Sequence, residues 1–307
     1  MNDLYKRIIM AREMSWKKFG KAITFYKPGM IKINGISGKY PVISVTGDHC
    51  ALQCDHCRGD LLKYMNLATT AENLVDKCIR IYEQKNHGVL ISGGCDQFGR
   101  LPWDRFIPAI WKIKEKTGLY ISVHSGLLDY HTAAELKSAG VDQALIDVIG
   151  DDETYRSVYH VPFGISRIIS TLEALQKAEL ETVPHIVCGL FYGKIKGEDK
   201  AIEIISRFNV RQAAIVSVMN ISKAANFKLP SAKSIADIIA KARIALPDVS
   251  LSLGCARERG NRIIETMAID AGINKMALPS DEAVEHAEKH GLAINYQNTC
   301  CSVVKKC

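Results

Sequence analysis

The stretch that decides the fold is Cys50-Ala-Leu-Gln-Cys54-Asp-His-Cys57, in which three cysteines are spaced three and then two residues apart. The chain has 10 cysteines in 307 residues, so this spacing would arise by chance in only about one chain in a hundred of this length. The apolar run Pro41-Val-Ile-Ser-Val-Thr precedes the cysteines. We therefore expect them on a loop that leaves a buried strand.

Three thiolates in one loop are suited to binding iron. They can hold three irons of a 4Fe–4S cluster, which four cysteines normally ligate. The loop contains no fourth cysteine, so one iron would keep a position open for an outside ligand. The alternative is tetrahedral zinc with His49 or His56 as fourth ligand. Zinc sites usually combine two short segments that each carry Cys or His ligands. Here the cysteines lie in one compact segment, which favours the cluster.

Composition limits the class of protein. Hydrophobic residues make up 47% of the chain and the formal net charge is +7. No run of 18 apolar residues predicts a membrane span, no Lys/Arg block indicates nucleic acid, and the first residues lack a signal-peptide core. We expect a cytoplasmic enzyme that binds neither membrane nor nucleic acid, with reduced cysteines that ligate metal. The positive field would suit docking of an acidic carrier protein.

Strand and helix patterns alternate about eight times, at spacings near 30 residues. The predicted helices are 3–19, 69–86, 103–117, 131–139, 163–179, 199–207, 231–246, 261–271 and 280–290. The predicted strands are 41–46, 87–92, 119–124, 144–150, 182–188, 213–219, 249–253 and 273–278. Alternation predicts parallel strands joined by crossover helices. The fold class is therefore α/β, a parallel (β/α)8 TIM-type barrel, with an open or partial barrel as the alternative.

This pattern divides the chain into three parts. Residues 1–40 form a helical lead-in, 41–279 the barrel, and 280–307 a C-terminal helix with a cysteine-bearing tail. Functional residues of such barrels lie at the C-terminal ends of strands. There we take His124 and Asn220 as candidate substrate contacts and Asp147 as a candidate contact to a ribose hydroxyl. A histidine satisfied by backbone and an aspartate that caps a turn are the structural alternatives.

A second group of cysteines could hold another 4Fe–4S cluster. Its members are Cys95, Cys255, Cys300 and Cys301. The first two end predicted strands, and the last two lie in a tail that could fold back over the barrel mouth. Cys188 or Cys307 could substitute for one of them. The alternative is that these are reduced, unrelated thiols.

The C-x3-C-x2-C spacing after a first strand resembles the radical S-adenosylmethionine (SAM) superfamily. The resemblance implies that the open iron binds SAM and that the cluster cleaves it to a 5′-deoxyadenosyl radical, which removes hydrogen from an unactivated carbon. The residue before the third cysteine is usually aromatic there, and here it is His56. Gly93 and Gly94 resemble the superfamily's Gly-Gly-Glu segment that carries the SAM amino group, with Cys95 in place of Glu. Gly189 resembles a strand-five glycine that makes room for the cofactor.

Other segments resemble the biotin-synthase-related branch and, more closely, one partner of the two-protein lipoyl synthase known mainly from archaea. They are Ile91-Ser-Gly-Gly-Cys-Asp, Leu253-Gly-Cys-Ala-Arg-Glu-Arg-Gly and Cys300-Cys301, and the resemblance spans about 40–303. It implies sulfur insertion into an octanoyl chain on a carrier-protein lysine, with the second cluster as sulfur source. It also implies a partner radical SAM protein and an external low-potential electron donor.

Two other functions remain open at this point. One is a different radical SAM reaction on a small molecule, such as biotin-type sulfur insertion or metal-cofactor assembly. It needs Cys50, Cys54 and Cys57 but no carrier domain. The other is a non-enzymatic iron–sulfur scaffold or electron carrier, which would not cleave SAM.

Overall fold

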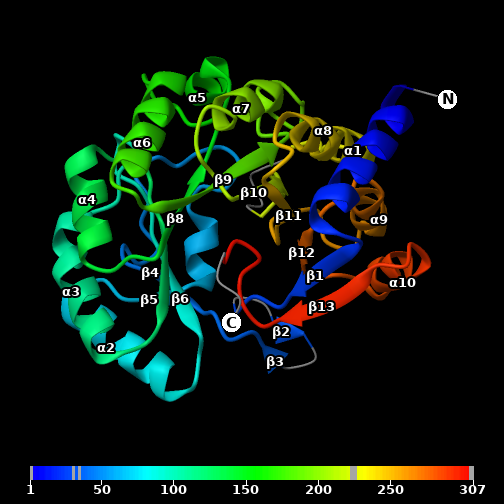
Figure 1. Cartoon of the computed structure of the whole chain (residues 1–307). Coiled ribbons are helices and arrows are strands. Elements are labelled where there is room, and N and C mark those ends of the chain that lie inside the picture. The colour runs from blue at the N-terminus through cyan, green and yellow to red at the C-terminus, as the bar shows by residue number, and fades with distance from the viewer. Residues whose placement is uncertain (1–2, 30–31, 34–35, 222–226, 304–307) are drawn as a thin grey trace.

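The computed structural model describes residues 3–29, 32–33, 36–221 and 227–303. Its main feature is a curved 11-stranded sheet (Figure 1). The strands of this sheet are β1 (Ala22–Tyr26), β4 (Val42–Ser44), β5 (Asn66–Leu67), β6 (Gly88–Ser92), β7 (Tyr120–His124), β8 (Gln143–Asp147), β9 (Glu181–Cys188), β10 (Gln212–Ser217), β11 (Ser250–Leu253), β12 (Lys275–Ala277) and β13 (Ala293–Gln297). Two further strands, β2 (Lys32–Ile33) and β3 (Ile36–Ser37), form an antiparallel pair apart from it.

The strand order is β13-β1-β12-β11-β10-β9-β8-β7-β6-β4-β5, and neighbouring strands pair in parallel throughout. The eight predicted strands are present as β4 and β6 to β12, side by side in chain order, which confirms the parallel α/β fold. The outermost described strands, β5 and β13, are not neighbours, so the barrel is open rather than closed.

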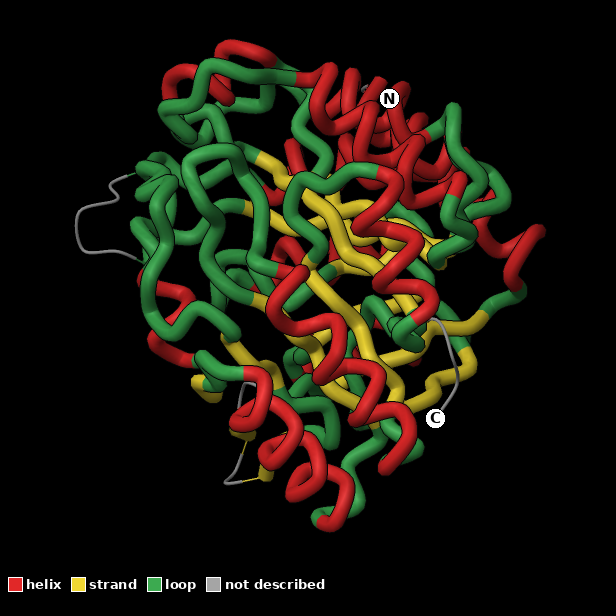
Figure 2. The backbone as a smooth tube through the Cα atoms, turned by 90° about the vertical axis from the view of Figure 1, so that its left-hand side faces the viewer, coloured by secondary structure: helices red, strands yellow, loops and turns green. Residues whose placement is uncertain are grey.

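Helices cover the outer face of the sheet (Figure 2). They are α1 (Asp3–Phe19), α2 (Ala71–Glu83), α3 (Trp103–Lys116), α4 (Tyr130–Ser138), α5 (Asp152–Ser157), α6 (Ile165–Lys177), α7 (Glu198–Ile205), α8 (Ala232–Ala245), α9 (Arg262–Asp270) and α10 (Asp281–Lys289), with a 3-10 turn η1 (Asp60–Tyr64). Their apolar stripes explain the packing: α2 buries Leu74, Cys78 and Ile81 at positions four and three apart, which lie on one helical face. Because both faces of the sheet are covered, strands such as β6 are buried along their whole length.

The N- and C-terminal regions contribute strands that the sequence patterns did not reveal. β1 lies between β12 and β13, so the predicted helical lead-in also contains a strand of the main sheet. β13 follows α10 where we expected only a tail. None of the described helices is both long and apolar enough to cross a membrane.

The segment after β13 lies inside the barrel rather than over its mouth, as the red C-terminal trace in Figure 1 shows. Side chains at the starts of three strands hold its carbonyl groups. Gln212 Nε2 donates to the Cys301 oxygen at 2.6 Å and Gln143 Nε2 to the Ser302 oxygen at 2.8 Å. Lys275 Nζ reaches the Val303 oxygen at 3.4 Å. The barrel interior therefore includes residues 300–303.

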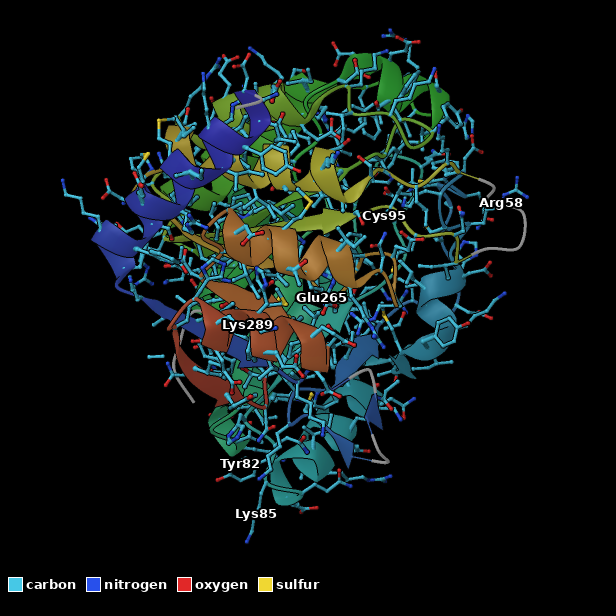
Figure 3. The ribbon with its side chains drawn as sticks, turned by 90° about the vertical axis from the view of Figure 1, so that its right-hand side faces the viewer. Arg58, Tyr82, Lys85, Cys95, Glu265 and Lys289 are labelled. Carbon is cyan, nitrogen blue, oxygen red and sulfur yellow. The ribbon has the colours of Figure 1, made fainter. Side chains whose placement is uncertain are left out.

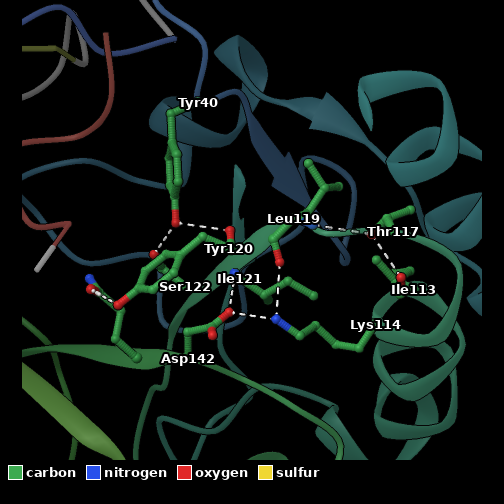
Figure 4. A network of polar contacts seen from close by, with 10 residues as sticks. Tyr40, Ile113, Lys114, Thr117, Leu119, Tyr120, Ile121, Ser122 and Asp142 are labelled. Carbon is green, nitrogen blue, oxygen red and sulfur yellow. Dashed lines mark hydrogen bonds and ion pairs between the residues drawn. The ribbon is translucent and has the colours of Figure 1, made fainter. Parts of the chain in front are cut away.

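A polar network that includes Tyr40, Tyr120 and Ser122 lies along β7 (Figure 4). The Tyr120 hydroxyl donates to Gln143 Oε1 at 2.9 Å, which turns the amide nitrogen of Gln143 toward the Ser302 carbonyl. Tyr40 bonds to Ser122 and to the Tyr120 carbonyl in the same network. Through Tyr120, this network supports the Gln143 amide that bonds to the tail.

Candidate functional site

A cavity of 430 Å³ lies where the strands of the half-barrel end. Its lining includes all seven cysteines proposed as cluster ligands: Cys50, Cys54, Cys57, Cys95, Cys255, Cys300 and Cys301. Gly93, Gly94, His124 and Asp147 line it as well. Among the described residues, the structure thus brings most of the predicted site to one space.

Local hydrogen bonds shape the first cysteine loop. The Cys54 carbonyl accepts from Cys57 N at 3.1 Å and from Arg58 N at 2.9 Å, which closes a tight turn. Ala51 N donates to the Cys95 carbonyl at 2.8 Å and ties the loop to the end of β6. The loop is thus bonded internally and to the barrel, a requirement for holding three ligands in place.

Gly94 allows the end of β6 to approach this loop. A Cβ at this position would lie 2.1 Å from the His49 oxygen and 2.6 Å from the Cys50 Cα, which is far inside contact distance. Gly94 N donates to Thr46 Oγ1 at 2.6 Å, so the backbone of the β6 end is bonded to residues before the loop. Glycine is therefore required here for close backbone packing.

The spacing of the three thiols suits a cluster better than a single zinc ion. Tetrahedral zinc draws its sulfur ligands to about 3.8 Å of one another, from Zn–S bonds of about 2.3 Å. In the part of the chain that the structure describes, the group of three Cys, His, Asp or Glu ligands gathered within 4.8 Å is Asp270, His286 and His290. Among the described residues, Cys50, Cys54 and Cys57 do not form such a group, which does not favour a single zinc ion held by all three.

Two thiols of the first loop, Cys54 and Cys57, lie in surroundings that favour the protonated form. Burial raises the pKa of Cys57 to about 11 and that of Cys54 further still, and the neighbouring thiols add to both shifts. Burial also raises the pKa of Cys95 to about 12, with the Cys50 thiol adding to it. Metal insertion must displace these protons. The donor set, its spacing and the space beside it fit a 4Fe–4S cluster with one open iron.

Cys255, Cys300 and Cys301 form a separate group on the other side of the lining. They pack together around Tyr26 and Ala277. Cys95 instead packs against the main core and lies beside the first loop. The structure thus brings three of the four cysteines proposed for a second cluster together and places the fourth near the first cluster loop.

Positive charge and hydrogen bonds surround this second group. Burial raises the pKa of Cys255 to about 11, although the charges of Arg257 and Arg259 oppose the rise. The hydrogen bond between the two thiols lowers the pKa of Cys300 and raises that of Cys301. The charges of Arg257 and Arg259 favour a thiolate at Cys255, which is the form that binds metal.

Two histidines and Asp147 form the polar part of the lining between the two groups. His185 Nδ1 lies 3.2 Å from Asp147 Oδ1, and His185 Nε2 lies 3.2 Å from Ser302 Oγ. Burial, and then the charge of His185, lowers the pKa of His124 to about 4, so His124 is neutral. Burial would raise the pKa of Asp147, but the hydrogen bond and charge of His185 outweigh it and hold that pKa below its ordinary value.

His56, before the third cysteine, also lines the cavity. Its Nδ1 is buried and has no hydrogen-bond partner among the described residues. Burial lowers the pKa of His56, so the ring is neutral and can accept or donate a hydrogen bond there. An unpartnered polar atom in the lining fits a cavity that receives a polar ligand.

Gly189, Cys188 and Asn220 are absent from the described lining of the cavity. Gly189 N donates to Glu198 Oε1 at 2.7 Å, so the Glu198 carboxylate holds the turn after β9. Asn220 uses both ends of its amide on the backbone of Phe227, at 2.9 Å each. Cys307 lies outside the described residues.

Three residues of the site were missed by the sequence reasoning. His185 could have been found from the pattern of β9, where it follows Val183 by two positions on a strand expected to be buried. Ser302 adjoins the cysteine pair, but nothing in its sequence context indicates that the tail enters the barrel. Arg257 is fully buried and donates to the Gly254 oxygen at 2.6 Å. Nothing in the sequence indicates that this arginine is buried, because arginines in loops are usually exposed.

The fold is a parallel half-barrel of the TIM-barrel type, with three cysteines in the loop after its first barrel strand, β4. The family model described as "Radical SAM superfamily" matches residues 44–205, and the chain belongs to this superfamily. Membership implies a 4Fe–4S cluster and SAM as cofactors, in agreement with the loop geometry.

Curated relatives point to one branch at low identity. The chain is 24% identical over 249 residues to biotin synthase of Geotalea daltonii, covering 75% of this chain and 72% of that protein. It is 22% identical over 177 residues to biotin synthase of Leptospira biflexa serovar Patoc, covering 54% of this chain and 47% of the relative. These two biotin synthases agree with the broader resemblance, and neither is a lipoyl synthase.

Solved structures share the fold across nearly the whole chain. Methylornithine synthase superposes with a TM-score of 0.64 at 17% identity, covering 95% of this chain and 89% of that one. The FeFe-hydrogenase maturase HydG from Carboxydothermus hydrogenoformans gives a TM-score of 0.66 at 16% identity, covering 96% and 72%. At such identities the likeness establishes the fold alone.

Proposed function

We propose that this radical SAM enzyme inserts sulfur into an alkyl chain, and that its substrate is an octanoyl chain on the lysine of a carrier protein. The observation that carries the proposal is the shared cavity. The first cysteine loop and the group of Cys255, Cys300 and Cys301 line the same 430 Å³ space. Sulfur insertion at an unactivated carbon needs a radical source and a sulfur source beside one substrate, and this arrangement supports both.

The roles of the residues follow from their places in the lining. Cys50, Cys54 and Cys57 would hold the SAM cluster, which when bound supplies the electron that cleaves SAM and frees a radical able to remove a hydrogen atom. Cys255, Cys300 and Cys301 would hold a second cluster as the source of sulfur. The fourth ligand of this second cluster would be Cys95 or another group of the lining.

The other lining residues suit an alkyl substrate. Many of the other lining residues are apolar, for example Leu61, Met65, Leu90, Leu101 and Leu127. Such side chains bind hydrocarbon by removing it from water and offer no groups that react readily with it. An octanoyl chain fits this surface better than a charged small molecule does.

A small-molecule substrate is the second candidate, because the curated relatives are biotin synthases. Dethiobiotin-like substrates are also alkyl compounds that receive sulfur, so the two candidates share the residues above. They differ in whether a carrier protein and a partner radical SAM protein take part. The chain's net charge of +7 favours an acidic carrier.

The test is anaerobic incubation of the reconstituted protein with SAM, a low-potential reductant and an octanoyl-lysyl peptide from a carrier domain, with and without a partner radical SAM protein. We expect 5′-deoxyadenosine and a peptide mass gain that corresponds to sulfur. Reconstituted protein should hold about eight irons, four per cluster. Cys54→Ala should abolish 5′-deoxyadenosine, whereas Cys78→Ala, at a buried thiol of α2, should not.

Three outcomes separate the candidates. SAM cleavage with an unchanged peptide, even beside the partner, would favour a small-molecule substrate. About four irons, with sulfur insertion surviving Cys255→Ala and Cys301→Ala, would remove the second cluster from the proposal. No 5′-deoxyadenosine at all would leave an iron–sulfur scaffold or electron carrier.

A further inference from the structure

A group of metal-ligand residues lies on the outer surface, away from the cavity. Asp270 is the last residue of α9, His286 is in the last turn of α10, and His290 is the C-cap of α10. His286 Nε2 and His290 Nε2 lie 2.8 and 2.9 Å from the same Asp270 oxygen. None of the three lines the cavity in the described structure.

Helix geometry places the two imidazoles for joint binding. Residues four apart on a helix lie one above the other on one face, and the two rings have centroids 4.8 Å apart. All three ligand atoms lie within 4.8 Å of one another. Zinc with bonds of about 2.0–2.1 Å needs its ligand atoms about 3.3 Å apart. Binding would therefore need an outward shift of about 0.4 Å at the Asp270 contacts and a closer approach of the two imidazole nitrogens, which lie within 4.8 Å of each other.

The electrostatics of the helix ends favour a cation. α9 and α10 both end at this group, and the C-terminal end of a helix carries partial negative charge. Arg12 and Lys21 oppose this effect, because they lie over the ring of Trp16, which contacts His290 edge-on at 5.8 Å. The Asp270 carboxylate offsets their repulsion, so binding should depend strongly on its charge.

We propose that Asp270, His286 and His290 bind a divalent transition metal ion, zinc or one of similar preference, with water as a fourth ligand. All three side chains are part-buried, between 22% and 32% exposed, so an ion can enter from solvent. Figure 3 faces the outer surface of α9 and α10, with Glu265 and Lys289 marking the two helices.

A bound ion would join α9 to α10 just before β13. The chain after β13 carries Cys300 and Cys301 into the barrel. The ion would therefore restrain the segment that precedes the second cysteine group. This role is structural and independent of which substrate the cavity accepts.

The test is calorimetric titration of zinc into the anaerobically reconstituted holoprotein, with iron counted before and after. We expect one zinc per chain with no loss of iron, and a rise in thermal midpoint on zinc addition. His286→Ala and His290→Ala should each weaken zinc binding at least tenfold. Asp270→Asn keeps an oxygen that accepts hydrogen bonds but removes the charge, so it should also weaken binding while the protein stays folded.

His131→Gln is the control, because His131 forms an i,i+4 contact of 3.6 Å with Glu135 on α4, and among the described residues no third ligand joins them. This variant should bind zinc as the wild type does. The proposal is overturned if the holoprotein takes up no zinc. It is equally overturned if uptake is unchanged in His286→Ala and His290→Ala, or occurs only with release of iron, since zinc would then occupy the cluster cysteines.

Discussion

Arg257 and Glu265 form an ion pair that is almost closed to solvent, with Nη2 2.6 Å from Oε1 and side chains 1% and 8% exposed. The same guanidinium donates to the Gly254 oxygen at 2.6 Å and to the Leu278 oxygen at 3.0 Å. It thereby bonds the end of β11, directly before Cys255, to the segment after β12. The pair connects helix α9 to the lining of the cavity.

Removing the carboxylate should destabilise the protein strongly. Glu265→Ala leaves the Arg257 charge buried without its partner, which costs about 3–5 kcal/mol. Chemical denaturation of wild type and variant measures the loss. The control is Glu203→Ala on α7, where exposed pairs with Lys200 and Arg207 should leave stability little changed. Equal stabilities for wild type and Glu265→Ala would contradict the importance of the pair.

The same pair predicts a loss of stability in acid. Burial would raise the pKa of Glu265, but the Arg257 charge and the Ser280 hydrogen bonds outweigh it and hold that pKa below its ordinary value of 4.5. A folded pKa below the unfolded one stabilises the protein above about pH 4.5, and this contribution disappears as the pH falls through the folded pKa. Thermal midpoints between pH 6 and 3 should therefore fall more steeply for wild type than for Glu265→Gln. Parallel pH curves would show that Glu265 contributes nothing.

A methyl group at Gly94 should displace the first cysteine loop. In Gly94→Ala the new carbon would meet the His49 oxygen at 2.1 Å, so we expect less iron after reconstitution and at least a tenfold loss of SAM cleavage. Gly118→Ala is the control, because its nearest neighbour is a Tyr82 side-chain atom at 3.9 Å. Iron content and 5′-deoxyadenosine formation are measured for both. Full iron occupancy in Gly94→Ala would refute the close packing.

Loss of a tail contact should affect the second cysteine group and spare the first. Gln212→Met keeps the length of the side chain but cannot donate to the Cys301 carbonyl. We expect iron to fall from about eight toward four per chain while SAM cleavage continues. Gln176→Met removes an exposed acceptor for Asn209 N and should change neither quantity. A Gln212→Met protein with all its iron would show that this hydrogen bond does not position the tail.

The parts of this fold that follow from local sequence were predictable. Strands β4 and β6 to β12 have buried apolar runs between helical patterns, and the cysteine loop needs only the spacing of Cys50, Cys54 and Cys57. β1 and β13 were not predicted, because their assignment depends on pairing with each other and with β12 over more than 200 residues. Non-local pairing of this kind leaves little trace in a short sequence window.

The sequence also could not predict which cysteine group each thiol joins. Cys95 and Cys255 both follow strands, yet one adjoins the first loop and the other the tail. Curvature of the sheet and the path of residues 298–303 decide this, and both are tertiary properties. The direction of the tail depends on Gln143 and Gln212, whose amides look like ordinary polar residues at strand starts.

The place of β1 between β12 and β13 has a consequence for how the molecule is assembled. Residues 22–26 are among the first to be synthesised, yet both of their partners come from 275–297. Until those residues have been made, β1 has two unpaired edges, each able to associate with other chains. Pairing between segments so far apart in the chain is also slow. We therefore expect the newly made N-terminal strand to need protection by a chaperone.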